Sequence, residues 1–272
     1  MSLTTPALAP VVAPLPNTAR GEKGMRVGAF VLALVVVAFA YAARSPQTFL
    51  GLHPLTAWLI ELGLVFILFV TIGRGFNLYW FGILVDGRNK IALSRLQVVL
   101  WSILFIGTFP VIYFWNMAHA PDLAQALDLT VPDAVWALMG MAGASAAATP
   151  LILSAKPDPS ADNPAIPPQD PDKMLDGIVV KRRSDCRPLW SDVVMGDESG
   201  NADVIDISKV QQLLLTAVAV AVYGGAIGKT LLLADRTSSM ISALPGMTSG
   251  FLLLIAASHA TYLGYKAASH SN

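Results

Sequence analysis

The sequence predicts an all-α fold: a polytopic membrane helix bundle of six transmembrane helices, with an internal tandem repeat of a two-helix module. Composition is the first reason, because the 272 residues are 54% hydrophobic and only 13% charged, whereas a typical soluble domain carries about 25% charged residues. The second reason is a series of six apolar stretches, each close to the roughly 20 residues that cross a bilayer. The third is that the last four stretches form two similar pairs.

The six expected spans alternate with loops of unequal charge. The spans are Val27–Ala43, Leu55–Ile72, Leu96–Met117, Pro132–Ala155, Val210–Ala234 and Met247–Tyr265. The N-terminal segment, the second and fourth loops and the C-terminal segment hold 15 of the 18 Lys and Arg residues, and the other three loops hold two. Because cytoplasmic loops are enriched in Lys and Arg, we expect both termini in the cytoplasm.

Residues 1–26 are expected to form a disordered cytoplasmic tail. Prolines spread among small residues prevent a continuous helix there, namely Pro6, Pro10, Pro14 and Pro16. The N-terminal transmembrane hairpin then covers residues 27–73. Its first span ends at Ala40-Tyr41-Ala42, which resembles a signal-peptide cleavage site, but the long lead-in favours a retained signal anchor. Cleavage of the first span stays open.

The next four spans contain the repeat. Ile91–Gln97 matches Ile205–Gln211 at an offset of 114 residues, and Pro132 and Ser145 match Pro245 and Ser258 at an offset of 113. A looser similarity links Trp80–Val85 with Trp190–Met195. The shared motif is Ser-basic-x-Gln, formed by Ser94, Arg95 and Gln97 in one copy and by Ser208, Lys209 and Gln211 in the other.

These matches divide the rest of the chain into four parts: a first two-span module (74–155), a cytoplasmic Pro-rich and basic linker (156–189), a second two-span module (190–266) and a cytoplasmic tail (267–272). Two spans per copy give both copies the same orientation, so a pseudo-two-fold axis would run along the membrane normal. This argues against an inverted-repeat transporter. We expect Ser94 and Ser208 to cap their helices while the adjacent cations meet anionic lipid.

The polar turns before the repeated spans carry a family resemblance. Leu84–Asn89 followed by Leu93–Gln97, and Gly196–Asn201 followed by Asp206–Gln211, resemble stretches of uncharacterised multi-pass bacterial inner-membrane proteins with repeated Ser-Arg/Lys-x-Gln two-span modules. The resemblance covers about residues 76–266. It implies the same architecture and a bacterial inner (plasma) membrane, and it implies no activity.

Glu61, Lys229 and His259 are ionisable residues that lie well inside the expected spans. Glu61 and Lys229 would lie about 9 Å and about 7.5 Å from the outer ends of their helices, at 1.5 Å per residue. We favour a Lys229 side chain that reaches the outer headgroups, over a Glu61–Lys229 ion pair and over a transport role. His259 is expected to be a neutral imidazole hydrogen-bonded between helices, because no carboxylate lies at a matching depth.

Small residues at helical spacing predict where helices approach closely in a bilayer. They lie in the last three spans and just before the sixth, as Gly140 with Ala144, Gly224 with Gly228, and Gly246 with Gly250. Packing within the chain is the favoured interpretation, and a homo-oligomer interface is the alternative.

The linker between the modules begins as an extended Pro-rich segment and continues into a basic run. Lys181, Arg182 and Arg183, with Trp190 nearby, predict a collar at the cytoplasmic membrane surface. Such a collar binds either anionic lipid or a protein partner, since a cationic run with an aromatic side chain serves both.

The sequence argues against catalysis. It has no Cys/His cluster and no Ser/His/Asp set, so we expect no enzyme, catalytic residue, cofactor or metal. The stretch Gly224–Thr230 is no phosphate loop, because Tyr223 occupies the leading glycine position inside an apolar span. A net charge of zero argues against nucleic acid.

We therefore expect a non-catalytic integral inner-membrane protein that organises or scaffolds a membrane complex through helix packing and its basic cytoplasmic surface. The alternative is a channel or transporter formed by the pseudo-symmetric spans, possibly as a homo-oligomer. Polar residues are scarce within the spans, which favours the first function because a water-filled path needs polar lining.

Overall fold

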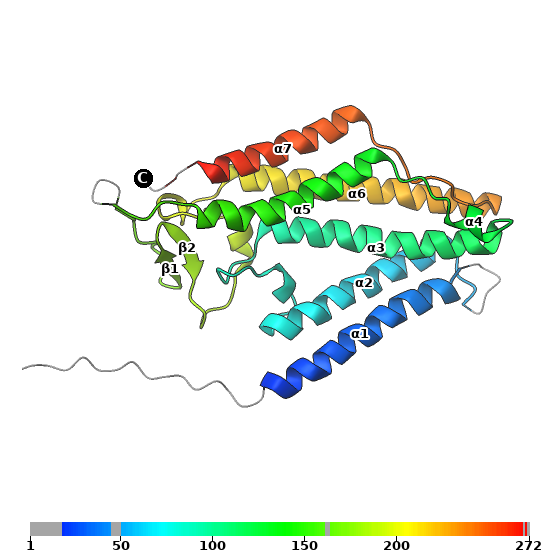
Figure 1. Cartoon of the computed structure of the whole chain (residues 1–272), viewed down its shortest axis with the longest axis horizontal. Coiled ribbons are helices and arrows are strands. Elements are labelled where there is room, and N and C mark those ends of the chain that lie inside the picture. Colours follow the sequence, from blue (N-terminus) through cyan, green and yellow to red (C-terminus); the bar gives the residue numbers. More distant parts are fainter. Residues whose placement is uncertain (1–17, 45–49, 161–163, 269, 271–272) are drawn as a thin grey trace, which may run out of the picture.

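The computed structural model describes residues 18–44, 50–160, 164–268 and 270. These residues form seven α-helices and one β-hairpin (Figure 1). The helices are α1 Thr18–Ala42, α2 Pro54–Asn77, α3 Leu93–His119, α4 Leu123–Leu127, α5 Asp133–Ser154, α6 Ile207–Thr237 and α7 Ser249–Ala267. The antiparallel strands are β1 Lys173–Asp176 and β2 Val179–Arg182, and Gly177 makes the tight turn between them with φ of 62°.

The helices are consistent with an all-α membrane protein. Four of them contain stretches long and apolar enough to cross a bilayer: Pro54–Gly75, Leu93–His119, Asp133–Ser154 and Ile207–Thr237. The apolar part of α1, Arg26–Ala42, is shorter. Residues 1–17 of the expected tail lie outside the described residues, whereas residues 18–26 form the first turns of α1 rather than a tail.

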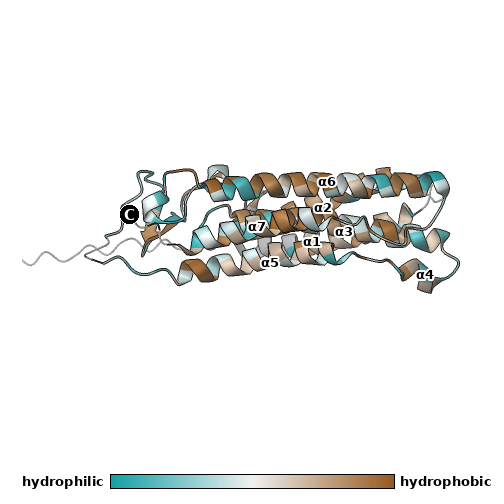
Figure 2. Cartoon of the chain, turned by 90° about the horizontal axis from the view of Figure 1, so that it is seen from above, coloured by the Kyte–Doolittle hydropathy of each residue, from teal (hydrophilic) through white to brown (hydrophobic). Residues whose placement is uncertain are grey.

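The long helices run side by side and share two ends (Figure 1). The start of α1, the end of α2, the β-hairpin and the end of α7 lie at one end, and α4 lies at the other. Hydrophobic residues predominate along the middle of the helices, and hydrophilic ones gather toward the two ends (Figure 2). α3 packs on α5 and α6, and α7 packs on α5 and α6, so these four form one unit, while α1 and α2 form a hairpin that contacts α3.

The N-terminal caps of α3 and α6 differ from the expected ones. Asp206, not Ser208, is the N-cap residue of α6, and its carboxylate accepts from the backbone N–H groups of Ser208 and Lys209. α3 follows Ala92, whose side chain makes no capping bond. The prediction that Ser94 and Ser208 cap the helices is therefore wrong, because each is the second residue of its helix.

A single apolar core runs through the bundle and a smaller one lies at the hairpin end. The large core includes Trp58, Phe105, Ile112, Trp115 and Ile227. The smaller core joins α3 and α7 to the segments that precede α3 and α6, through Phe81, Ile91, Val193 and Tyr262. We call residues 78–92, 156–160 and 164–206, which cover this second core, the polar cap.

Candidate functional site: a buried charge cluster in the polar cap

Two turns of the polar cap place the cluster. The first turn is closed by the bridge between Val85 and Ile91, with the Asp86 N–H donating to the Lys90 carbonyl over 2.9 Å. The second is closed by the bridge between Met195 and Ile205. Strand β2 fixes the second turn, because the Val180 N–H donates to the Asp197 carbonyl. Both turns thus hold their charged side chains close to the start of a long helix.

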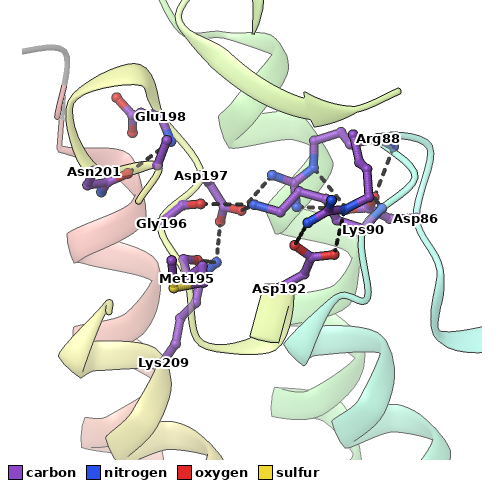
Figure 3. A network of polar contacts seen from close by, with 12 residues as sticks. Asp86, Arg88, Lys90, Asp192, Met195, Gly196, Asp197, Glu198, Asn201 and Lys209 are labelled. Carbon is purple, nitrogen blue, oxygen red and sulfur yellow. Dashed lines mark hydrogen bonds and ion pairs between the residues drawn. The ribbon is translucent and has the colours of Figure 1, made fainter. Parts of the chain in front are cut away.

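Asp197 is the centre of the cluster (Figure 3). Its side chain is 7% exposed, and its carboxylate receives the Arg88 guanidinium at 2.6 Å and the ammonium groups of Lys209 at 2.8 Å and Lys90 at 3.4 Å. Lys266, from the last turn of α7, contacts the same carboxylate. One buried anion therefore joins the turn before α3 to α6 and to α7.

The electrostatics of the cluster follow from burial and from this crowding of cations. Burial alone would raise the pKa of Asp197, but Arg88, Lys209 and the other cations hold it well below the usual range. Burial lowers the pKa of Lys90 to about 7, because its attraction to Asp197 is offset by the neighbouring cations. Burial would also lower the pKa of Arg88, but Asp197 and Asp86 raise it above its ordinary value.

Backbone carbonyls complete the coordination of the lysines. The Lys90 ammonium donates to the Gly196 carbonyl over 2.9 Å, and the Lys209 ammonium donates to the Met195 carbonyl over 2.6 Å. These bonds satisfy cations that Asp197 cannot neutralise alone. The cluster thus holds the polar cap against α6 and α7. No group of three or more metal-ligating side chains occurs among the residues that the structure describes.

The expected basic collar is not a free cationic surface. Arg182 is buried and forms an ion pair with buried Asp192 at 3.0 Å. Lys181 pairs with Asp176, and the exposed Arg183 pairs with Asp185. Carboxylates two to ten residues away along the chain thus pair with all three cations. Binding of lipid or of a protein partner by this collar stays a prediction. Trp190 is 45% exposed, and its ring centroid lies 5.8 Å from that of Trp80.

Within the four-helix unit, buried polar side chains pair across helices. His259 on α7 contacts the Ser145 hydroxyl of α5 through Nδ1 at 2.6 Å, which confirms the expected hydrogen bond between helices. The other pairs are Gln97 with Thr216 at 2.7 Å, Thr149 with Tyr262 at 3.3 Å, and Gln212 with Ser258. Because each pair bridges two helices, the polar interior of this unit is largely closed on itself.

Glu61 and Lys229 are not brought together. Glu61 on α2 is fully buried, and neither carboxylate oxygen has a hydrogen-bond partner among the described residues. Lys229 is exposed on α6. The ion-pair hypothesis is therefore wrong, because the Lys229 side chain lies on the outside of the bundle.

The small residues divide into those that contact another helix and those that do not. A Cβ at Gly224 would lie 3.6 Å from Leu104, and one at Gly228 would lie 3.5 Å from Trp58, so α6 approaches α2 and α3 closely there. Four others are exposed: Gly140, Ala144, Gly246 and Gly250. Packing within the chain therefore does not explain these four, because no neighbouring helix covers them. Gly107, which the sequence analysis missed, lies against Leu62 of α2.

The repeated motif residues lie in unlike surroundings. Ser94 and Gln97 are buried on α3, whereas Gln211 is exposed and Gln212 is buried in its place. Arg95 is exposed and donates to the Val85 carbonyl over 2.8 Å, whereas Lys209 is buried against Asp197. By burial, Ser94 and Gln97 of α3 therefore correspond to Lys209 and Gln212 of α6, one residue later than the sequence match of Ser94 and Gln97 with Ser208 and Gln211.

Asp197 and Lys266 were missed as site residues. The available signal was the similarity between Asp86-Gly87 and Gly196-Asp197, which places a carboxylate in each turn before a repeated helix. Lys266 had no signal of its own, because its position against Asp197 depends on how α7 packs on α6.

Comparison with protein-family models, with curated proteins and with solved structures found no match to this chain.

Proposed function

We propose that this protein is a non-catalytic integral membrane protein that organises a membrane complex, holding a rigid polar cap at one end of a closed helix bundle. The observation that carries the proposal is the charge cluster around Asp197, which ties the cap to α6 and α7. A cap fixed in this way presents a surface of constant shape to a partner, because a buried multi-ion cluster has few alternative geometries.

The closed interior supports an organising role over a water-filled path. Polar side chains that line a channel face water, whereas the side chains in the pairs Gln97–Thr216, Ser145–His259 and Thr149–Tyr262 bond to one another. The Gln97 Oε1 atom is buried and has no partner among the described residues. The partner surface that we propose is the exposed aromatic pair of Trp80 and Trp190. Aromatic side chains of this kind dominate the energetics of many interfaces.

We further propose six spans in a bacterial inner membrane, with α1 and α7 crossing beside α2, α3, α5 and α6. The excess of Lys and Arg in the N-terminal segment, the second and fourth loops and the C-terminal segment supports a cytoplasmic location for both termini and for the polar cap. The common end shared by the start of α1 and the end of α7 agrees with this orientation (Figure 1).

A tandem repeat of the two-helix module is part of the proposal, and contacts between equivalent residues support it. Thr130 forms a parallel bridge with Ala243, and the Thr149 hydroxyl contacts the Tyr262 hydroxyl; both pairs are 113 residues apart. This is the offset that relates Pro132 to Pro245 in the sequence. Equivalent residues meet where a pseudo-two-fold axis passes between two copies.

Purification from the native membrane in mild detergent tests the organising role. The tagged protein should carry a foreign partner at fixed stoichiometry by native mass, and Trp190→Ala should lose it. Ile166→Ala is the control, because Ile166 is an apolar linker residue that is 51% exposed. Isolation of a pure homo-oligomer, or retention of the partner by Trp190→Ala, would contradict this function.

A second candidate function is a channel or transporter, and Glu61 is the observation that favours it. An intramembrane carboxyl group without a partner is costly unless its protonation or a transported ion gives it a role. Wild-type protein in proteoliposomes should then pass protons measured with an enclosed pH dye, Glu61→Gln should not, and the exposed-site control Lys229→Gln should behave as wild type. Absence of flux in the wild type would remove this candidate.

A further inference from the structure

A cavity of about 820 Å³ opens between the start of α3, the end of α5 and the β-hairpin. This volume falls within the range of small-molecule sites, which is roughly 300–1,000 Å³. Its apolar wall comes from the end of α5, with Ala146, Pro150 and Leu153, and its polar wall comes from α3 and the polar cap. The cavity therefore lies where the apolar helices meet the charged end of the molecule.

Most charged groups that line the cavity already have partners. Arg88 pairs with Asp86 and Asp197, Lys181 pairs with Asp176, and Lys156 pairs with Glu198 at 2.8 Å. Two lining residues remain without an ionic partner among the described residues, namely Arg95 and Asp158. The cavity thus offers one unmatched cation and one unmatched anion.

Arg95 has donors to spare. One guanidinium nitrogen donates to the Val85 carbonyl over 2.8 Å, whereas a guanidinium carries five N–H donors in a fork that suits phosphate oxygens. Asp158 is exposed on the segment after α5, and its carboxylate oxygen lies beside Gly177 of the hairpin turn. An ammonium group is the natural complement of such a carboxylate.

Uncharged polar atoms also line the cavity. Ser94 is buried, and no described residue makes a hydrogen bond to its hydroxyl, although it lines the cavity. Pro150 has no backbone N–H, so the helical bond that the Ala146 carbonyl would accept is missing. A donor hydroxyl and an acceptor carbonyl are thus available next to the apolar wall.

α3 and α5 pack against each other, and their contact seam has the cavity at one end. A second hollow lies further along this seam, lined by Phe109, Tyr113, Leu129, Val131 and Trp136. From Arg95 to Phe109 the axis of α3 rises by about 21 Å, at 1.5 Å per residue. A molecule with a polar head in the cavity and an apolar chain along this seam would match both features.

We propose that this cavity binds the headgroup of a zwitterionic glycerophospholipid, with the phosphate on Arg95, the ammonium on Asp158 and an acyl chain along the α3–α5 seam. Ser94 would donate to the glycerol ester region. This binding site depends on the membrane location of the helices and not on the organising function.

The charge of the lining selects the class of headgroup. A headgroup with phosphate alone would satisfy Arg95 and place its negative charge close to Asp158, which is unfavourable. A free ammonium compound would leave Arg95 unmatched. Only a headgroup that carries both charges complements the two unpaired side chains at once.

Native mass spectrometry in detergent tests the proposal with two probes, phosphatidylethanolamine and phosphatidylglycerol. Wild-type protein should retain one phosphatidylethanolamine per chain in preference to phosphatidylglycerol. Arg95→Gln should weaken retention of both lipids about tenfold, because it removes a charge-assisted hydrogen bond to the phosphate. Asp158→Asn should abolish the preference, because it removes the partner of the ammonium and leaves the phosphate contact that both lipids share.

Arg183→Gln is the matched control, because Arg183 is an exposed cation of the polar cap outside the cavity lining. It should retain phosphatidylethanolamine as the wild type does. Ser94→Leu, which fills the cavity from its buried wall, provides a second route to loss of binding. Equal retention of the two lipids by the wild type, or unchanged retention by folded Arg95→Gln, would overturn the proposal.

Discussion

The polar cap and the N-terminal hairpin both bury ionisable side chains, and they do so in opposite ways. In the cap, the buried Asp197 carboxylate meets Arg88, Lys209 and two further cations. In α2, the Glu61 carboxyl group is fully buried and neither oxygen has a partner among the described residues. A buried charge is tolerated when it is paired and hydrogen-bonded, and otherwise the group is driven to its neutral form.

The comparison of Asp197 with Glu61 shows which buried ionisable groups stabilise the fold. Removal of Asp197 would leave several cations in a confined space, so its contribution is structural. Glu61 makes no bond that its removal would break, so stability does not explain its presence. The hairpin is instead held by shape, where Gly228 of α6 faces Trp58 and Gly107 of α3 faces Leu62, and by the Trp58–Thr108 hydrogen bond of 2.9 Å.

The largest expected effect comes from the anion of the cap. Asp197→Asn should lower the free energy of unfolding by about 3–5 kcal/mol, because breaking a buried ion cluster from one side leaves uncompensated charge. Thermal unfolding in detergent micelles measures this loss. Asp185→Asn is the control, because Asp185 forms an exposed pair with Arg183 and should leave the unfolding temperature unchanged. Equal unfolding temperatures for the two variants would show that the cluster does not hold the cap.

A smaller loss should follow from disturbing the shape-based contact of the hairpin. Gly228→Leu adds a side chain where the first new atom, the Cβ, would lie 3.4 Å from Leu55 and 3.5 Å from Trp58. Overpacking of this kind costs about 1–3 kcal/mol. Gly140→Leu makes the same chemical change on a helix face with no heavy atom within 4 Å of the new Cβ. If both variants unfold at the same temperature, α2 does not pack on α6 as described.

Substitution of Glu61 should raise the free energy of unfolding, in contrast to the two substitutions above. Glu61→Leu replaces an unpartnered buried carboxyl group with an apolar side chain of similar size, and should raise the free energy of unfolding by about 1–2 kcal/mol. Gln97→Leu is the contrasting variant, because it breaks the bond to Thr216 and should lower stability by about 1–2 kcal/mol. A Glu61→Leu variant less stable than the wild type would place a structural partner at Glu61.

The sequence predicted the long apolar helices, but it did not predict which charged side chains pair. Apolar length alone predicted the four long spans, because crossing a bilayer demands about 20 apolar residues whatever the packing. The pairing of His259 between helices was also predictable, since a buried imidazole needs a partner. These inferences depend on local composition or on one residue at a time.

The charge cluster depends on tertiary packing, and local patterns misled us there. Arg182 belongs to a basic run that resembles a lipid-binding surface, yet β2 turns it inward onto Asp192, ten residues away. Asp197 meets Lys266 only because α7 packs on α6. Gly140 and Ala144 have the spacing of a packing face and lie exposed on α5, because spacing shows that a face is smooth and not what covers it.

The smallest expected change in stability at neutral pH concerns Lys90. It tests whether the loss of one cation from the cluster matters less than the loss of its anion. Lys90→Met removes one of four cations around Asp197 and leaves the anion well paired. The stability of the folded protein at pH 7 should therefore change by less than about 1 kcal/mol, in contrast to Asp197→Asn.

The pH dependence distinguishes this variant from the wild type. Burial lowers the pKa of Lys90 from 10.5 to about 7, so between these values the unfolded chain holds a proton that the folded chain has released. Stability rises with pH wherever the unfolded state binds more protons. The wild type should thus gain stability from pH 7 to about 10, and Lys90→Met should show a smaller gain over the same range. Equal gains in both proteins would assign the rise to another group and leave Lys90 charged and paired within the cluster.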